Sequence, residues 1–245
     1  MTKAIDNFAI IVPARRASLR LPDKVLTDIG GKPMIVRVLE RAAAAAPDIL
    51  LAAVDDDEIA AIIRAAGFNV IITGDCDSGT ARVAAASQHL SPDTIIVNMQ
   101  GDEPFMEPHI PRHTAQLLAR HDDCVCATPM RPIIDQAEFN NPAVVKVVAD
   151  ADGTARYFSR APIPHQRRGG MPQAWAHLGL YAYRASFLRR FVTMNTAPTE
   201  QSECLEQLRI LWHGGRIALL ECQSQSFAID TPDDLARARH RAAAD

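Results

Sequence analysis

The sequence has no large excess of charge of either sign. Lysine and arginine number 26 and aspartate and glutamate number 29, so the formal net charge is −3 at pH 7. A protein that binds nucleic acid nonspecifically needs a positive field to attract the phosphate backbone. The charge balance therefore argues against a nucleic-acid partner.

Long hydrophobic runs are also missing. No stretch approaches the roughly 18 apolar residues of a membrane-spanning helix. The first apolar run, Phe8 to Val12, is too short for the core of a signal peptide. The five cysteines are an odd number and form no Cys-x-x-Cys motif, which favours free thiols over disulfides. We expect a cytoplasmic protein with no membrane segment.

Two common phosphate-binding motifs are absent. The chain contains no Gly-x-Gly-x-x-Gly fingerprint of dinucleotide-binding proteins and no complete P-loop. The segment Gly74 to Thr80 has the glycine spacing of a P-loop, but Thr80 stands where the lysine should be. A nicotinamide-dependent dehydrogenase and a P-loop NTPase both lose support.

The composition that is present is typical of a globular protein, with 48% hydrophobic and 22% charged residues. Short apolar runs without alternation predict strands buried on both faces of a parallel sheet. Helical patterns separate them and are predicted to begin at Pro33, to run from Asp57 to Ala66, and to run from Gly79 to about Leu90. The predicted strands are Ala9 to Val12, Ile49 to Val54, Val70 to Thr73 and Thr94 to Met99.

The pattern changes after Pro132. Two apolar runs, Val144 to Val148 and Arg156 to Phe158, flank Asp152-Gly153, which predicts an antiparallel hairpin. No repeat, low-complexity tract or linker divides the chain, so we predict one mixed-sheet domain over residues 1–245. The remaining predicted elements are strands at His177 to Tyr183 and Ile217 to Cys222, and helices at Glu203 to Trp212 and from Thr231.

A basic loop follows the first predicted strand. Residues 13–24 hold four cations, Arg15, Arg16, Arg20 and Lys24. Ligands of parallel sheets bind beyond the carboxyl ends of the strands, and a mixture of arginine forks and a lysine point charge suits a polyphosphate. A solvated basic loop is the alternative.

Two carboxylates are candidates for a metal site. Asp102 lies three residues after the end of the predicted strand Thr94 to Met99, and Asp230 ends another short apolar run. Carboxylates at such positions can hold a hard cation that bridges phosphate oxygens. For Asp230 the alternative is an ordinary helix N-cap. Ser78, Gly79 and Thr80 could offer hydroxyls and backbone amides to an anion or a base, or could simply cap a helix.

An ordered set of motifs resembles the 3-deoxy-manno-octulosonate cytidylyltransferase (CMP-Kdo synthetase) family from about residue 8 to residue 240. The motifs are Pro13-Ala14-Arg15, Arg20-Leu21-Pro22-x-Lys24, Gly31-Lys32-Pro33-Met34-Ile35, Ser78-Gly79-Thr80, Asn98-x-Gln100-Gly101-Asp102-Glu103-Pro104, Asn141-Pro142, Val145-Lys146-Val147-Val148, Tyr157-Phe158-Ser159-Arg160, Leu205-Glu206-Gln207-Leu208-Arg209 and Asp230-Thr231-Pro232-x-Asp234-Leu235.

The resemblance implies a three-layer α/β/α nucleotide-diphospho-sugar transferase-like fold, with a mainly parallel mixed sheet and a small antiparallel extension. It implies transfer of CMP from CTP to the anomeric hydroxyl of the acid sugar Kdo, with release of pyrophosphate, for lipopolysaccharide synthesis. Magnesium would be required. The protein would be a cytoplasmic homodimer whose acceptor-binding and dimerisation portion lies around residues 132–215.

The resemblance also implies roles for individual residues. Arg15, Arg20 and Lys24 would hold the triphosphate, and Arg15, Lys24 and Asp102 would be catalytic. Asp102 and Asp230 would bind magnesium. The other nucleotide-binding residues would be Ser78, Gly79, Thr80, Arg82 and Gln100, and the sugar-binding residues would be Arg160, His177, Tyr181, Glu206 and Gln207.

The residues alone leave alternative roles for the predicted sugar-binding residues and alternative acceptors. Without the resemblance, His177 would be read as a hydrogen-bonded histidine in a strand, and Glu206 and Gln207 as a solvated helix face. Kdo, its 8-amino analogue and another acid sugar all remain possible acceptors, and a catalytically silent nucleotide-sugar binding protein is the non-enzyme alternative. Four positions depart from the family pattern: Asp23 replaces glycine, Val25 proline, Cys76 histidine and Ala81 an acid.

Overall fold

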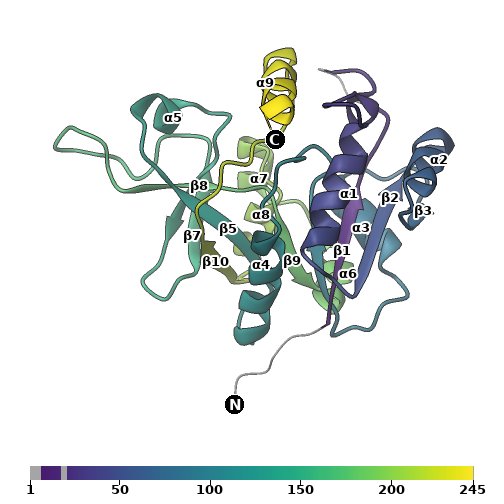
Figure 1. The fold of residues 1–245 in the computed structure, drawn as a ribbon. Helices are drawn as coiled ribbons and strands as arrows, with labels where there is room; N and C mark the ends of the chain where they lie inside the picture. Colours follow the sequence, from purple (N-terminus) through teal and green to yellow (C-terminus); the bar gives the residue numbers. More distant parts are fainter. Residues whose placement is uncertain (1–6, 18–20, 245) are drawn as a thin grey trace.

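The computed structural model describes residues 7–17 and 21–244. Within them, ten strands form one sheet in the order β3-β2-β1-β4-β9-β5-β8-β6-β7, with β10 paired to β5 (Figure 1). The strands are β1 (Phe8–Pro13), β2 (Ile49–Val54), β3 (Val70–Ile72), β4 (Ile95–Asn98), β5 (Cys126–Ile133), β6 (Lys146–Ala149), β7 (Ala155–Ser159), β8 (Ala174–His177), β9 (Tyr181–Arg184) and β10 (Ile217–Glu221).

Helices cover both faces of the sheet. Helices α1, α2 and α4 pack on one face, and α3, α6 and α8 pack on the other. Apart from the short 3-10 helix η1 (Lys24–Leu26), the helices are α1 (Met34–Ala44), α2 (Asp57–Ala65), α3 (Gly79–Ala86), α4 (His109–Arg120), α5 (Gln136–Asn140), α6 (Ala185–Phe191), α7 (Pro198–Glu203), α8 (Gln207–Trp212) and α9 (Pro232–Ala244).

The residues of β1 show how the three layers are held together. Ile10 and Val12 are fully buried among the residues of α1, α2 and α4, whereas Ile11 is fully buried among those of α3, α6 and α8. Burying one such side chain contributes roughly 1.5–3 kcal/mol. The predicted three-layer arrangement is therefore confirmed. None of the helices in the described ranges is both long and apolar enough to cross a membrane.

The predicted parallel half of the sheet is confirmed. β1 pairs in parallel with β2 and with β4, and β2 pairs in parallel with β3. β3 differs from the prediction because it lies at the edge of the sheet, where Ile71 and Ile72 are exposed rather than buried on both faces. An apolar run alone does not tell a central strand from an edge strand.

Helix boundaries follow local capping. Asp56 caps α2 by accepting hydrogen bonds from the amides of Glu58 and Ile59 at 2.9 and 3.0 Å, and Gly67 follows the helix with a left-handed φ of 86°. α3 ends at Ala86, earlier than predicted, where the hydroxyl of Ser87 donates to the carbonyl of Ala84 at 3.0 Å.

The second half contains both a confirmed and a wrong prediction. β6 and β7 form the predicted antiparallel hairpin. The single strand predicted at His177 to Tyr183 is wrong, because β8 ends at His177 and β9 begins at Tyr181. Both strands pair antiparallel with β5. Between them the amide of Leu180 donates to the carbonyl of Leu178, which interrupts the ladder.

Two more differences have local causes. The helix predicted at Glu203 to Trp212 begins only at Gln207, where α8 starts, because α7 ends at Glu203 and Cys204 adopts a left-handed φ of 51°. β5 has no counterpart in the prediction, since Pro129 and Pro132 lie within it and proline is disfavoured in a central strand.

The loops at the carboxyl ends of β1, β2 and β4 meet at one edge of the sheet, beside α9 (Figure 1). Gly101 lets them approach, because a Cβ added there would lie 2.7 Å from the carbonyl oxygen of Pro13. A larger residue would push the loop after β4 away from β1. The site described below is built at this edge.

Candidate active site

A cavity of about 440 Å³ opens at this edge of the sheet. The loops after β1 and β4 line it, together with the start of α3 and Asp230, which lies two residues before α9. It therefore brings together segments that are far apart in sequence. Among the residues predicted to bind nucleotide or metal, the lining includes Arg15, Lys24, Ser78, Gly79, Arg82, Gln100, Asp102 and Asp230.

Lys24 lies between the two predicted metal-binding aspartates. Its ammonium donates to Oδ2 of Asp102 at 2.6 Å and to Oδ1 of Asp230 at 3.0 Å. Burial alone would lower the pKa of Lys24, but the negative charges and hydrogen bonds of the two aspartates raise it above its ordinary value. The lysine therefore stays charged and holds the two carboxylates together.

These two carboxylates fit a divalent cation such as magnesium. The ammonium of Lys24 shows that one positively charged group can contact both of them at once. Magnesium prefers oxygen ligands and commonly uses one or two carboxylates together with substrate phosphates and water. Asp102 and Asp230 would supply the protein's part of such a site.

A different cluster of metal-ligating residue types lies away from the cavity. In the described part of the chain, His121, Asp123 and Cys124 place one potential ligand atom each within 4.8 Å of one another. Arg216 already pairs with Asp123 at 2.6 Å. Burial also raises the pKa of the Cys124 thiol, which favours the protonated form that does not bind metal.

The basic loop is only partly directed to the cavity. Arg15 lines it, but Arg16 turns away and pairs with Asp56 at 3.2 Å and with Glu58 at 2.6 Å. The expectation that all four cations serve one anionic ligand is therefore wrong for Arg16. Arg20 lies outside the described residues.

Asp23 precedes Lys24 in a left-handed conformation, with φ 51° and ψ 30°. Glycine adopts positive φ without steric cost, so the glycine that the family resemblance implies at this position would fit this geometry. Aspartate is one of the few other residues that tolerate it. Two other residues also depart from the pattern of the family that the sequence resembles. Val25 is buried next to Lys24, and Cys76 lines the cavity.

Arg82 is held by the protein itself. Only 3% of its surface is exposed, and it donates to Oγ1 of Thr73 at 2.7 Å, to the carbonyl of Gly74 at 3.0 Å and to Asp55 at 3.1 Å. It borders the cavity, but these bonds fix the loop after β3. Sequence reasoning missed Asp55, although its position directly after β2 was a usable signal.

Ser78 and Asp230 are both candidates for capping a helix, and only Ser78 does so. Ser78 does cap α3, because its hydroxyl oxygen accepts from the amide of Ala81 at 3.1 Å. Asp230 does not have this role at α9. There the hydroxyl of Thr231 accepts from the amide of Asp234 at 3.2 Å, and the Asp234 carboxylate accepts from the amide of Thr231 at 2.9 Å. The carboxylate of Asp230 is directed to Lys24 instead.

Four of the predicted sugar-binding residues lie near one another. Thr80 donates to Oε2 of Glu206 at 2.7 Å, which links the nucleotide-binding set to the sugar-binding set. The rings of His177 and Tyr181 lie 5.3 Å apart, and after burial the charge of Glu206 contributes to raising the pKa of Tyr181. Gln207 is 2% exposed and its Nε2 has no hydrogen-bond partner among the residues that the structure describes, so a solvated helix face is wrong for Gln207.

His177 is fixed by Thr128, a residue that sequence reasoning missed. Nε2 of His177 lies 2.8 Å from Oγ1 of Thr128, and the same hydroxyl lies 2.6 Å from the carbonyl of Leu180. Because the hydroxyl has one proton and donates it to that carbonyl, its oxygen accepts from Nε2–H. Burial lowers the pKa of His177 to about 3, so the ring is neutral and Nδ1 is an acceptor.

Arg160 lies in a separate network of backbone contacts. Its guanidinium donates to the carbonyls of Glu203 at 2.8 Å and of Pro142 at 3.1 Å. The fully buried ammonium of Lys146 donates to the carbonyls of Arg160, Val144 and Asn141 at 2.6, 2.7 and 3.0 Å. Lys146 belongs to a family motif, but sequence reasoning gave it no role.

This chain is similar to a known protein family and to solved structures. The cytidylyltransferase family matches residues 9–217. The solved structure of CMP:2-keto-3-deoxy-manno-octonic acid synthetase in complex with CTP is 36% identical, with a TM-score of 0.92, over 98% of this chain and 99% of that one.

A more distant structure shares the fold. The 4-diphosphocytidyl-2C-methyl-D-erythritol synthase of Anaerococcus prevotii DSM 20548 is 11% identical, with a TM-score of 0.62 over 96% of this chain and 98% of that chain. At this identity the likeness concerns the arrangement of strands and helices alone.

Proposed function

This chain belongs to the cytidylyltransferase family, and from that membership we propose that it transfers CMP from CTP to the anomeric hydroxyl of Kdo. The products are CMP-Kdo and pyrophosphate. The observation that carries the proposal is the convergence of Lys24, Asp102 and Asp230 in one cavity. The complex of the 36% identical synthetase with CTP supports the choice of nucleotide.

The reaction is an in-line displacement at the α-phosphorus of CTP, and its main difficulty is the meeting of two anions. Lys24 and Arg15 line the cavity and would neutralise the triphosphate, which stabilises the charge that develops on the phosphoryl oxygens. Asp102 and Asp230 would hold magnesium, which would neutralise negative charge on the phosphate oxygens. No covalent enzyme intermediate is needed.

The acceptor side would recognise the hydroxyls and the carboxylate of the sugar. Nδ1 of the neutral His177 and the carboxylate of Glu206 are both hydrogen-bond acceptors, and the Thr80 bond to Glu206 would join this side to the nucleotide. Arg160 would meet the sugar carboxylate with the exposed part of its guanidinium. We assign no side chain as the general base.

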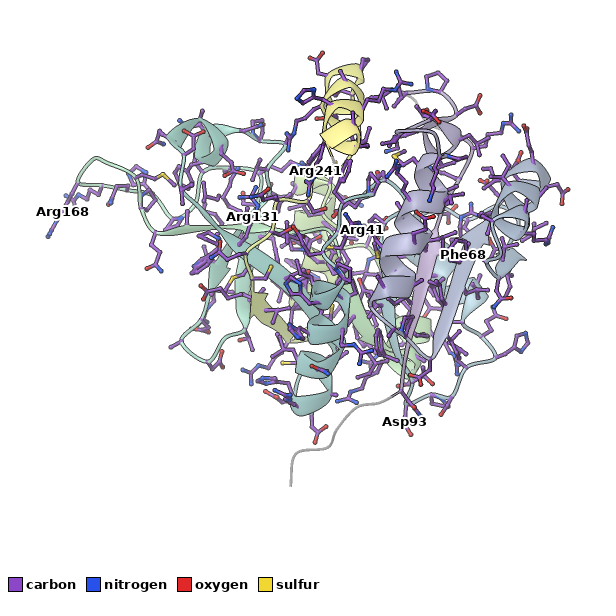
Figure 2. The ribbon with its side chains drawn as sticks, viewed as in Figure 1. Arg41, Phe68, Asp93, Arg131, Arg168 and Arg241 are labelled. Atoms are coloured by element: carbon purple, nitrogen blue, oxygen red, sulfur yellow. The ribbon has the colours of Figure 1, made fainter. Side chains whose placement is uncertain are left out.

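The proposal extends to the cellular setting. The protein would act in the cytoplasm in lipopolysaccharide synthesis, as a homodimer that uses residues 132–215. Two large apolar side chains in that portion support a partner surface there, since Ile134 is 89% exposed and Trp212 is 57% exposed. Figure 2 shows Arg168 at the tip of the long connection between β7 and β8, which projects away from the rest of the molecule.

One assay tests the activity. The purified protein is incubated with CTP, UTP or ATP and with Kdo, 8-amino-Kdo or sialic acid, with and without magnesium, while pyrophosphate release and the sugar nucleotide are measured. The proposal predicts turnover with CTP and Kdo that requires magnesium. Turnover with 8-amino-Kdo or sialic acid but not with Kdo would contradict it, as would tight CTP binding without any product.

A further inference from the structure

Two segments that are far apart in sequence lie side by side behind the predicted metal site. The acidic segment comprises residues 102–107, which follow β4, and the closing segment comprises residues 224–230, which precede α9. At one end the carboxylate of Glu107 accepts from the hydroxyl of Ser224 at 2.6 Å and from the amide of Gln225 at 2.9 Å. At the other end the amide of Ile229 donates to the carbonyl of Asp102 at 3.0 Å.

Aromatic rings hold the middle of the two segments. Phe105 of the acidic segment stacks on Phe227 of the closing segment with ring centroids 5.6 Å apart. The guanidinium of Arg241 (labelled in Figure 2) lies 4.5 Å from the Phe105 ring, and that of Arg237 lies 3.5 Å from the Phe227 ring. These contacts fix the two segments against each other along their length.

Glu103 lies inside this arrangement, next to Asp102. Its residue is 7% exposed, and its Oε2 accepts from the hydroxyl of Ser226, which is also 7% exposed, at 3.1 Å. A Cβ added to Gly179 would lie 3.5 Å from Oε1 of Glu103, so the acceptor-side loop packs against the same carboxyl. A buried carboxyl group needs such a partner because burial without hydrogen bonds is costly.

The bond between Glu103 and Ser226 bears directly on the cation site. Ser226 lies four residues before Asp230, and Ile229 between them is tied to Asp102. The course of the chain from Ser226 to Asp230 therefore decides where the Asp230 carboxylate lies relative to that of Asp102. The ammonium of Lys24 reports this placement, because it contacts both carboxylates at once.

We propose that Glu103 is a positioning residue which, by holding Ser226, places Asp230 opposite Asp102 and so sets the affinity of the site for a divalent cation. The inference rests on the proposed function for the identity of the cation and deepens it. Glu103 does not touch the substrate in this role. It acts through Ser226 and the closing segment.

The primary test is Ser226→Ala, which removes the hydroxyl and little else. Mn²⁺ binding in the presence of CTP is measured by electron paramagnetic resonance, and the magnesium concentration for half-maximal activity is measured separately. Loss of one buried hydrogen bond to a carboxylate corresponds to roughly 5- to 30-fold in an equilibrium constant. We expect both cation constants to weaken by about that factor, with the KM for Kdo changed less than twofold.

Ser159→Ala is the matched control. Ser159 is also buried and donates to a glutamate, Glu203, at 2.6 Å, but that glutamate contacts Arg160 rather than the cation site. The control should raise the KM for Kdo and leave Mn²⁺ binding within twofold of wild type. Ser226→Thr retains a hydroxyl and should restore cation binding relative to Ser226→Ala.

Glu103→Met supplies the second arm, since it removes the acceptor while keeping an elongated side chain. If the two residues act through one bond, Glu103→Met combined with Ser226→Ala should weaken Mn²⁺ binding no more than the worse single variant. Wild-type Mn²⁺ affinity in Ser226→Ala, equal weakening in Ser159→Ala, or additive losses in the double variant would each overturn the inference.

The two proposals fail in distinguishable ways. If wild type makes CMP-Kdo with magnesium and Ser226→Ala binds Mn²⁺ as wild type does, the positioning role is wrong and the function stands. If wild type makes no CMP-Kdo but Ser226→Ala weakens Mn²⁺ binding as expected, the function is wrong and the positioning role stands.

Discussion

The molecule has a proposed nucleotide side, which is the cavity lined by Lys24, Asp102 and Asp230, and a proposed acceptor side, which is the portion around residues 132–215. The two sides hold their charged residues in different ways. Lys24 on the nucleotide side is bound by two carboxylates across an open cavity. Lys146 on the acceptor side is fully buried and bound by three backbone carbonyls. A cation held by side chains in a cavity can exchange partners when an anionic ligand arrives. A cation that is held by backbone carbonyls is part of the folded scaffold. The same kind of substitution should therefore affect catalysis on the nucleotide side and stability on the acceptor side.

The largest expected effect is a loss of stability in Lys146→Met. The substitution keeps a long side chain but leaves the carbonyls of Arg160 and Val144 without this donor, while the carbonyl of Asn141 keeps the amide of Val144 at 3.2 Å. Each unsatisfied carbonyl costs about 1–3 kcal/mol. We expect a free energy of unfolding lower by about 3 kcal/mol or more, measured by urea denaturation. A variant as stable as wild type would show that the acceptor side does not depend on this ammonium.

Lys24→Met should instead act on catalysis. Loss of one preorganised cation at the reacting phosphate costs on the order of a hundredfold in kcat, or about 2.7 kcal/mol. The free energy of unfolding should change by less than about 1 kcal/mol, because the lysine and both carboxylates are partly exposed. Pyrophosphate release and urea denaturation of the same preparation measure the two quantities. A large loss of stability with unchanged kcat would reverse the comparison.

His177→Asn tests the burial of the acceptor side through pH. The pKa of His177 is about 3 in the folded protein and 6.5 for an unperturbed histidine. The unfolded chain therefore binds a proton first, and stability is lost as the pH falls from about 6.5 toward 3. One proton gives a slope of at most about 1.4 kcal/mol per pH unit.

The measurement for His177 is the free energy of unfolding of both proteins at pH 7, 6 and 5. The difference between them should shrink as the pH falls, because the asparagine variant lacks this proton. A constant difference over the three pH values would mean that His177 titrates normally.

The smallest effect is expected for Asp23→Gly. Glycine would relieve a left-handed conformation that costs other residues roughly 1–2 kcal/mol. It would also gain freedom in the unfolded chain and lose an exposed ion pair with Arg16 at 3.1 Å. These terms nearly offset, so the melting temperature should shift by no more than a few degrees and the KM for CTP should stay within twofold. A tenfold change in that KM would give Asp23 a direct part in triphosphate binding.

The nucleotide side was also the more predictable from sequence. The strands β1, β2 and β4 are continuous apolar runs, and Lys24, Asp102 and Asp230 could be grouped by the rule that ligands bind at strand ends, together with the family resemblance. The same reasoning failed on the acceptor side at β5. Pro129 and Pro132 lie within this central strand, where proline is disfavoured.

The residues that support the site were harder to predict. Thr128 and Ser226 act through partners that tertiary packing alone brings near them, and Lys146 reaches the carbonyl of Arg160 across the hairpin of β6 and β7. Their own sequence neighbourhoods carry no periodicity or spacing that indicates a role. Arg16 shows the converse error, since its sequence position in the basic loop suggested phosphate binding, while nearby Asp56 and Glu58 hold it away from the cavity.

The central claim is that Lys24, Asp102 and Asp230 form one site for a divalent cation and a triphosphate. The most direct measurement is Mn²⁺ binding in the presence of CTP, by electron paramagnetic resonance, for wild type, Asp102→Asn, Asp230→Asn and the double variant. A shared site predicts that each single variant binds Mn²⁺ at least about tenfold more weakly and that the double variant binds it no better than either single variant. Wild-type binding in Asp102→Asn or in Asp230→Asn would place that aspartate outside the site and contradict the account.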